Sequence, residues 1–167
     1  MIREFLIRRA LPLDAPNIIA LINEVGAEGI WLATDRYIPT SQWEQALHHP
    51  EAEPRAALFV AEMENRIVGW CRVFPYQFGN KSSHVADVGI GVYSGFRRRG
   101  IGKELMTTAI IWARTQRFEK LTLDLYSTNE TAKHLFEKVG FGVVGIRARH
   151  AKINGAYVDQ VLMEMEL

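Results

Sequence analysis

The sequence predicts an α/β fold in which one mixed β-sheet carries helices on both faces. Short apolar segments typical of strands alternate along the chain with segments whose apolar residues recur at helical spacing. Hairpin signals at residues 64–66 and 154–155 predict that neighbouring strands pair antiparallel. Neither a repeat nor a linker divides the 167 residues, so we expect a single domain over residues 1–167.

A strand and a helix are expected to open the chain. Residues 5–9 have the character of a short strand. Asp14, followed two residues later by Pro16, is predicted to cap the start of a helix. This helix should reach about Val25, because Gly26 is a typical residue at a helix end.

An aperiodic segment follows at residues 27–40, where we expect a loop or an irregular helix. Ser41 and Glu44 have the spacing of a capping box and predict a short helix through Leu47. Further strands are expected at residues 57–62, 67–73, 84–92, 121–126, 142–152 and 156–167, with a long helix at residues 101–117.

A second capping box predicts the last helix. Ser127 and Glu130 have the required spacing, and apolar residues at helical spacing follow them. Gly140 comes directly after the last apolar position and is expected to end this helix.

The composition is that of a globular protein with balanced charge. Twenty basic and nineteen acidic side chains give a formal net charge of +1. A general nucleic-acid or anionic-membrane binder would need a basic excess on one face, so neither partner is expected. Cys71 is the only cysteine, which excludes an internal disulfide. No segment has the pattern of a signal peptide or of a membrane span, so we expect a cytoplasmic protein.

Residues 88–102 predict a binding site for phosphate. They run from a strand through a turn with three consecutive arginines into Gly-Ile-Gly at the start of a helix. Backbone N–H groups at a helix start lack intrahelical partners, and the helix dipole adds positive potential there. Gly100 and Gly102 have no Cβ, so an anion can approach the main chain closely. The arginines at 97–99 can supply charged hydrogen-bond donors.

Two sequence blocks resemble the GNAT family of N-acetyltransferases. Arg97-x-x-Gly100-x-Gly102 is similar to the family's acetyl-CoA signature, (Gln/Arg)-x-x-Gly-x-(Gly/Ala). Downstream, Asn129 with the alanine three residues later, and residues 136–141, resemble the family's second conserved block. Because both blocks occur at the right separation, the resemblance is stronger than a single glycine motif would be.

The resemblance implies the fold and the ligands of that family. It implies a central, mostly antiparallel sheet, splayed at the cofactor site where the strand at 84–92 leaves the strand at 121–126. Acetyl-CoA would be the co-substrate, and no metal is expected. The main chain of residues 90–92 would bond its pantetheine arm, and Asn129 would hydrogen-bond the cofactor or cap a helix. The implied cofactor-binding residues are Ile90, Gly91, Val92, Arg97, Arg98, Arg99, Gly100, Ile101, Gly102, Lys103, Asn129, Ala132 and Phe136.

Three residues are candidates for catalytic proton transfer. The acceptor amine must lose a proton before it attacks, and His84 or Asp87, near the expected thioester, could take it. His84 and Asp87 are an odd number of positions apart, so their side chains point to opposite faces of a regular strand. Both can face the site only if a β-bulge lies between them. Many members of the resembled family have a tyrosine at the position of Phe136. The hydroxyl of that tyrosine protonates the departing thiolate. Tyr126 is the candidate substitute for that tyrosine.

The acceptor site is expected beside residues 27–40, which cap the acceptor cleft in the resembled family. Glu28 is expected to bind the substrate. Arg36 would pair with a substrate carboxylate, with Asp35 or with solvent. Residues 154–159 further resemble the branch that acetylates free amino acids or phosphinothricin-like compounds.

The predicted function is transfer of acetyl from acetyl-CoA to a primary amine of a small molecule or amino acid, by direct attack in a ternary complex. Three other hypotheses stay open: an acetyltransferase acting on a protein or peptide amine, a catalytically silent acyl-CoA-binding module, and a homodimerising structural domain whose cleft is vestigial. Phe136 in place of the family tyrosine is the reason for the silent module. Exposed strand edges also predict a homodimer.

Overall fold

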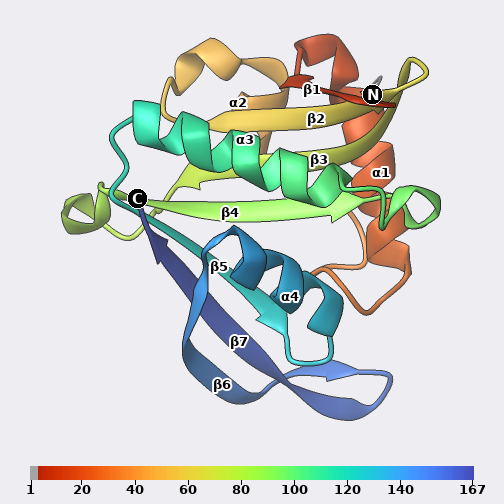
Figure 1. Ribbon diagram of the computed structural model, residues 1–167, viewed down its shortest axis with the longest axis vertical. Helices are drawn as coiled ribbons and strands as arrows, with labels where there is room; N and C mark the ends of the chain where they lie inside the picture. Colours follow the sequence, from red (N-terminus) through yellow and green to blue (C-terminus); the bar gives the residue numbers. More distant parts are fainter. Residues whose placement is uncertain (1–3) are drawn as a thin grey trace.

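The computed structural model describes residues 4–167 and confirms the predicted fold class. The strands are β1 (Leu6–Arg9), β2 (Ala57–Met63), β3 (Arg66–Pro75), β4 (Val85–Val92), β5 (Lys120–Tyr126), β6 (Gly142–Ile153) and β7 (Ala156–Glu166). The helices are α1 (Ala15–Ala27), α2 (Ser41–His48), α3 (Ile101–Thr115) and α4 (Glu130–Val139). The strands form one seven-stranded sheet in the order β1-β2-β3-β4-β5-β7-β6. Helices α1 and α2 lie on one face of this sheet, and α3 and α4 lie on the other (Figure 1).

The pairing of β4 decides the shape of the sheet. β4 pairs antiparallel with β3 along its whole length, from Ala86 to Val92. Its parallel pairing with β5, the only parallel pairing in the described sheet, ends at Asp87 and Thr122. Both strands continue past that point, so their carboxyl ends diverge (Figure 1). Main-chain groups of β4 therefore lie without a strand partner on the β5 side.

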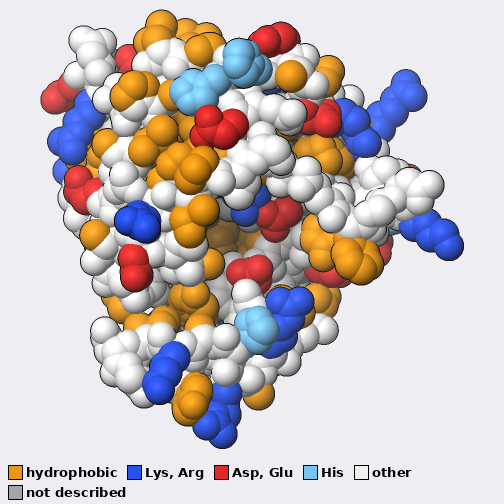
Figure 2. All heavy atoms as spheres, turned by 180° about the vertical axis from the view of Figure 1, so that it is seen from behind, with side chains coloured by type: hydrophobic (Ala, Val, Ile, Leu, Met, Phe, Trp, Pro, Cys, Tyr) orange, Lys and Arg blue, Asp and Glu red, His pale blue; other side chains and the backbone are white. Residues whose placement is uncertain are grey.

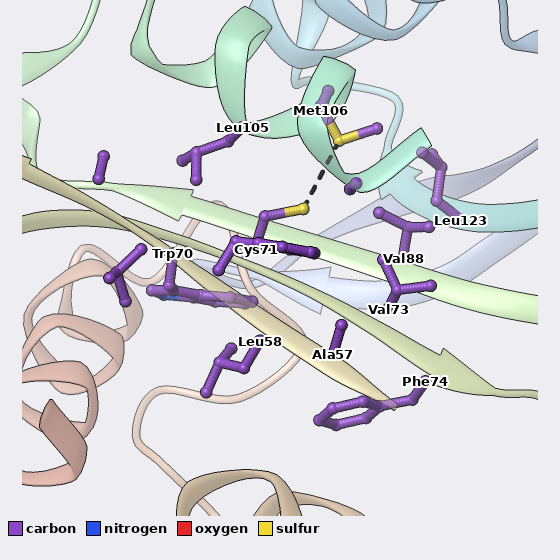
Figure 3. Packing of buried hydrophobic residues seen from close by; sticks show 14 of the residues in the cluster. Ala57, Leu58, Trp70, Cys71, Val73, Phe74, Val88, Leu105, Met106 and Leu123 are labelled. Atoms are coloured by element: carbon purple, nitrogen blue, oxygen red, sulfur yellow. Dashed lines mark hydrogen bonds between the residues drawn. The ribbon is translucent and has the colours of Figure 1, made fainter. Parts of the chain in front are cut away.

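Alternation along β3 builds the apolar core on both faces of the sheet. Trp70 packs edge-to-face on Trp43 of α2, with ring centroids 5.4 Å apart. The next residue, Cys71, points the opposite way, and its Sγ lies 4.0 Å from Sδ of Met106 in α3 (Figure 3). Burial raises the pKa of the Cys71 thiol to about 12, so this cysteine is a small core residue rather than a nucleophile.

The start and the end of α1 both differ from the prediction. Asp14 precedes the helix, but its carboxylate does not cap it. Instead it accepts hydrogen bonds from the Arg8 guanidinium at 2.7 and 2.9 Å and from the Leu11 N–H at 2.8 Å. The helix also continues through Gly26. A Cβ at Gly26 would lie 2.7 Å from the main chain of Asp35, so the glycine admits a close approach of the following loop.

Two helix caps are shifted from the predicted serines. Thr40 caps α2, with its hydroxyl accepting from the Trp43 N–H at 3.3 Å. Asn129 caps α4, with Oδ1 accepting from the Ala132 N–H at 3.1 Å. Gly140 ends α4 as predicted, in the left-handed region with φ of +113°.

The two predicted hairpins are confirmed. β2 and β3 are joined by Glu64 and Asn65, and β6 and β7 by Asn154 and Gly155. All four turn residues have positive φ, which matches the twist of the paired strands. None of the helices within residues 4–167 is long and apolar enough to cross a membrane.

Candidate active site

The turn at residues 93–100, which we name the arginine turn, leads from the end of β4 to the start of α3. Gly100, at the end of the turn, has a φ of +84°, and no side chain of residues 4–167 caps the helix. A Cβ at Gly100 would meet no atom within 4 Å, so the space beside this helix start is open. The first N–H groups of α3 lack intrahelical acceptors, and an anion placed there would satisfy them.

The other residues predicted for the phosphate site differ in their exposure to solvent. Arg98, Arg99 and Lys103 are exposed around the helix start and add positive charge. Gly102, in contrast, lies under Leu135 of α4, whose Cδ2 would be 3.0 Å from an added Cβ. This glycine therefore allows α3 and α4 to pack closely, and its part in binding an anion stays a prediction.

Arg97 does not point into solvent as a free phosphate donor. Its Nη1 and Nη2 donate to both carboxylate oxygens of Glu28, at 2.9 and 2.5 Å. Its Nε donates to the Val92 carbonyl at 2.9 Å. Trp31 Nε1 also donates to Glu28, at 2.5 Å. Hydrogen bonds from Arg97 lower the pKa of Glu28, which is neither a free carboxylate for substrate nor a candidate base.

Main-chain alternation decides which groups of β4 face its divergence from β5. The N–H of Tyr93 donates to Val68, and the N–H of Tyr76 donates to the carbonyl of Val85. Because hydrogen bonding alternates along an antiparallel strand, the groups of Ile90 and Val92 point away from β3. The groups of Gly91 point toward β3, so the prediction that all three residues bond a ligand is corrected. A Cβ at Gly91 would lie 2.7 Å from the Trp70 indole, which explains the glycine.

Polar side chains gather on the α1 and α2 face where β4 and β5 diverge. Asp87 pairs with Phe74, which packs on Trp43 of α2, so it faces this side. Leu123 lies on the α3 side (Figure 3), and alternation places Asp124 and Tyr126 on the opposite face. Seen from this side, the molecule has a hollow near its middle with acidic and basic side chains around it (Figure 2).

The pKa values of two of these groups are perturbed. Burial raises the pKa of Asp87, and the charge of Asp124 adds to the shift, while the ion pair with Arg72 opposes it. Burial also raises the pKa of Tyr126, and the carboxylates of Asp124 and Asp35 raise it further. These effects describe one electrostatically coupled group, to which the α1–α2 loop (residues 28–40) contributes Asp35.

The structure separates the three catalytic candidates. Asp87 and Tyr126 lie on the same face of the sheet, on the two strands that diverge, whereas His84 lies outside this region. His84 is exposed before the start of β4, where its carbonyl accepts from the N–H groups of Glu119 and Lys120. This is the end at which β4 and β5 still pair, so His84 lies away from the point where the two strands diverge.

The remaining predicted residues have plain positions. Phe136 is buried, with its ring centroid 6.1 Å from that of Phe141, and it has no group to donate a proton. Ala132 follows the cap residue Asn129 in the first turn of α4. Arg36 is exposed and makes no ion pair within residues 4–167, not even with Asp35. Within the same range, no three His, Cys, Asp or Glu side chains gather closely enough to hold a metal ion.

Sequence analysis missed Arg72 and Asp124. Arg72 lies between the buried residues Cys71 and Val73 on a central strand, and its guanidinium contacts the site of Gly89, whose missing Cβ leaves it room. A charged residue in a buried strand indicates that a partner of opposite charge lies nearby, because burying an unpaired charge is costly. Asp124 was visible only as the polar position of an alternating strand, and its electrostatic effect on Asp87 depends on the pairing of β4 and β5.

Known proteins are similar to this chain in sequence and in fold. The acetyltransferase (GNAT) family model matches residues 22–141. The L-amino acid N-acetyltransferase AaaT of Escherichia coli is 33% identical over 114 residues, which cover 66% of this chain and 68% of that protein. A crystal structure of a GNAT-family acetyltransferase from Streptococcus pneumoniae has a TM-score of 0.88 at 28% identity, over 98% of this chain and 100% of that one.

A second solved structure shares the fold. It is a GNAT-superfamily phosphinothricin acetyltransferase from Sinorhizobium meliloti in complex with acetyl-CoA, with a TM-score of 0.86. It is 19% identical and covers 98% of this chain and 89% of its own, so this likeness concerns the fold alone.

Proposed function

The chain belongs to the GNAT family of N-acetyltransferases, and we propose that it transfers acetyl from acetyl-CoA to the primary amine of an amino acid or a similar small molecule. The observation that carries this proposal is the divergence of β4 and β5 beyond Asp87 and Thr122. It lies between an open helix N-terminus on one side and a cluster of carboxylates on the other. An anionic co-substrate and a cationic acceptor could therefore meet there.

The acetyl-CoA site is assigned to the arginine turn and the end of β4. The free N–H groups at the start of α3, with Arg98, Arg99 and Lys103 around them, would hold the pyrophosphate. The main-chain groups of Ile90 and the N–H of Val92 would bond the pantetheine arm. A main-chain N–H at this place would also stabilise the oxyanion that forms during acyl transfer.

The acceptor amine is placed beside Asp87. Its nitrogen forms a bond to the acetyl carbon while the bond from that carbon to sulfur breaks, so the amine loses a proton and the thiolate gains one. Asp87 would take the first proton, directly or through water, because its raised pKa makes it a stronger base than an ordinary aspartate. Tyr126, whose phenol is protonated at neutral pH, would give a proton to sulfur.

A free amino acid fits the charges around this position. The carboxylates of Asp87, Asp124 and Asp35 would attract an ammonium group before it is deprotonated. The exposed Arg36 on the α1–α2 loop would attract a carboxylate, since it has no ion-pair partner within residues 4–167. The 33% identity to an L-amino acid N-acetyltransferase supports the same acceptor class.

Thiol release from acetyl-CoA would test the proposal across free amino acids, polyamines, aminoglycosides and short peptides. We expect turnover with one or more free amino acids. Asp87→Asn should lower kcat/KM by about 100-fold or more, because general base catalysis is lost. Glu51→Gln, which alters an exposed carboxylate near the end of α2, is the control. Preference for a peptide amine would overturn the acceptor class, and a small effect of Asp87→Asn would remove its catalytic role.

A homodimer through the sheet edge also stays a proposal. Val143, Val144 and Ile146 on the edge strand β6 and Tyr157 on β7 are exposed apolar side chains on one hairpin. Sedimentation velocity over a range of concentrations would test it, and a monomer at every concentration would contradict it.

A further inference from the structure

One guanidinium connects the α1–α2 loop to the arginine turn. Arg97 belongs to the turn, and its partners Glu28 and Trp31 lie at the beginning of the loop, more than sixty residues away in sequence. The guanidinium also lies over the Trp31 ring, with Cζ 5.4 Å from the ring centre. Through Nε, the same side chain holds the carbonyl of Val92, the last residue of β4.

The contact involves every side-chain oxygen of Glu28 and every side-chain nitrogen of Arg97. Both oxygens of Glu28 accept hydrogen bonds, and all three nitrogens of Arg97 donate. The two side chains are 29% and 30% exposed, so part of this network is shielded from water. The three hydrogen bonds use three of the five N–H groups of Arg97 and fix the direction of its guanidinium. The side chain therefore differs in purpose from Arg98 and Arg99, which are exposed.

Several contacts hold the α1–α2 loop, and among residues 4–167 its hydrogen bonds and ring contacts reach the arginine turn only at Arg97. Asp35 rests its main chain on Gly26 of α1, and the Tyr37 N–H donates to Oδ1 of Asn23 at 2.7 Å. Both of these anchors tie the loop back to the helix that precedes it. The contacts of Arg97 with Glu28 and Trp31 tie it to the strand end and turn assigned to acetyl-CoA.

We propose that the Glu28–Arg97–Trp31 contact couples the two substrate sites of this enzyme. It holds the α1–α2 loop in its acceptor-binding arrangement when the arginine turn is in its acetyl-CoA-binding arrangement. Each substrate then binds more tightly in the presence of the other, because coupling between two sites is reciprocal. Glu28 and Arg97 are positioning residues in this account, which rests on the proposed locations of acetyl-CoA and the amine.

Hydrogen exchange measured with and without coenzyme A would test the coupling without knowledge of the acceptor. In the unmodified protein, coenzyme A should slow amide exchange at residues 97–103, where it binds. It should also slow exchange at residues 28–40 by about tenfold, within the usual range of coupling between sites. Glu28→Gln should keep the slowing at 97–103 and reduce that at 28–40 to less than about twofold.

Glu24→Gln is the matched control, because it makes the same change one helical turn earlier on an exposed position of α1. It should behave like the unmodified protein. Slowing at 97–103 without slowing at 28–40, or full slowing at 28–40 in Glu28→Gln, would overturn the coupling alone. If coenzyme A slowed exchange in neither segment, the proposed acetyl-CoA site would fall with it.

Steady-state kinetics supply a second readout that a purely structural role would not move. With the amino acid that turns over best, Glu28→Gln should raise the KM of the amine by about tenfold at saturating acetyl-CoA. It should raise that of acetyl-CoA by a similar factor at saturating amine, because lost coupling weakens both substrates equally. Tighter acetyl-CoA binding in Glu28→Gln would contradict the proposal. Tighter binding would mean that Arg97 binds phosphate when it is released from its ion pair with Glu28.

Discussion

Helix α1 lies between two arginine–carboxylate pairs of similar geometry. At its start, Arg8 donates through Nη1 and Nη2 to Asp14, at 2.7 and 2.9 Å. At its end, Arg97 donates through the same two nitrogens to Glu28, at 2.9 and 2.5 Å. Each arginine makes a further bond through Nε, in the first case to the carboxylate of Glu62 and in the second to a main-chain carbonyl.

Burial separates the two pairs. The Asp14 side chain is 4% exposed and also accepts the Leu11 N–H, so it joins β1 to α1 within a single short segment. The Glu28 and Arg97 side chains are about 30% exposed and join segments distant in sequence beside the proposed active site. The same chemistry therefore stabilises the fold at one end of the helix and positions a loop at the other, because the cost of an unpaired charge rises with burial.

Removing the buried carboxylate should have the largest effect on stability. Asp14→Asn leaves Arg8 with Glu62 as its remaining carboxylate partner, and we expect the free energy of unfolding to fall by about 3 kcal/mol. Glu28→Gln should lower it by less than about 1 kcal/mol, since the exposed pair is screened by water. Urea unfolding of both variants measures the difference. Equal losses would show that burial does not distinguish the two ends of α1.

Gly26→Ala tests how closely the end of α1 fits the loop that follows. Alanine is favoured over glycine in a helix by about 1 kcal/mol. Here its Cβ would lie 2.7 Å from main-chain atoms of Asp35, which no side-chain rotation can relieve. Overpacking costs about 1–3 kcal/mol and should prevail, so the variant should lose stability and bind the amine more weakly.

Gly142→Ala is the control for this change, because an added Cβ there meets no atom within 4 Å. It should alter the free energy of unfolding by less than about 0.5 kcal/mol. Thermal unfolding and the KM of the amine check both variants. A stabilised Gly26→Ala protein would show that the loop can move away from α1 without loss.

Acid should lower the free energy of unfolding by protonating the carboxylates at both ends of α1. This loss should be smallest near neutral pH. Hydrogen bonds from the partner arginines lower the pKa of Asp14 and that of Glu28. A carboxyl group with a lowered folded-state pKa adds stability above its unfolded pKa of about 4, and this stability is lost as the pH falls through the folded value. Urea midpoints from pH 7 to pH 3 should therefore decline. The decline should be shallower in Asp14→Asn than in Glu28→Gln, and identical slopes would contradict this assignment.

Local patterns were sufficient for most of the fold. Period and turn chemistry predicted the strands, the main helices, the end of α4 at Gly140 and the hairpin at Asn154 and Gly155, because each of these depends on neighbouring residues. The helix caps were harder. Asp14 has the residue type of a cap, yet its carboxylate is held by Arg8 from an adjacent strand, and a tertiary partner outweighs a local preference.

The sequence by itself determined the order of elements, the family and the helix start that would hold an anion. Only the tertiary structure decided that Arg97 binds Glu28, that the charge of Asp124 acts on Asp87, and that Gly91 makes room for Trp70. These contacts join residues separated by whole strands and helices. Their partners follow from the order and register in which strands pair, and no spacing along the chain encodes that order.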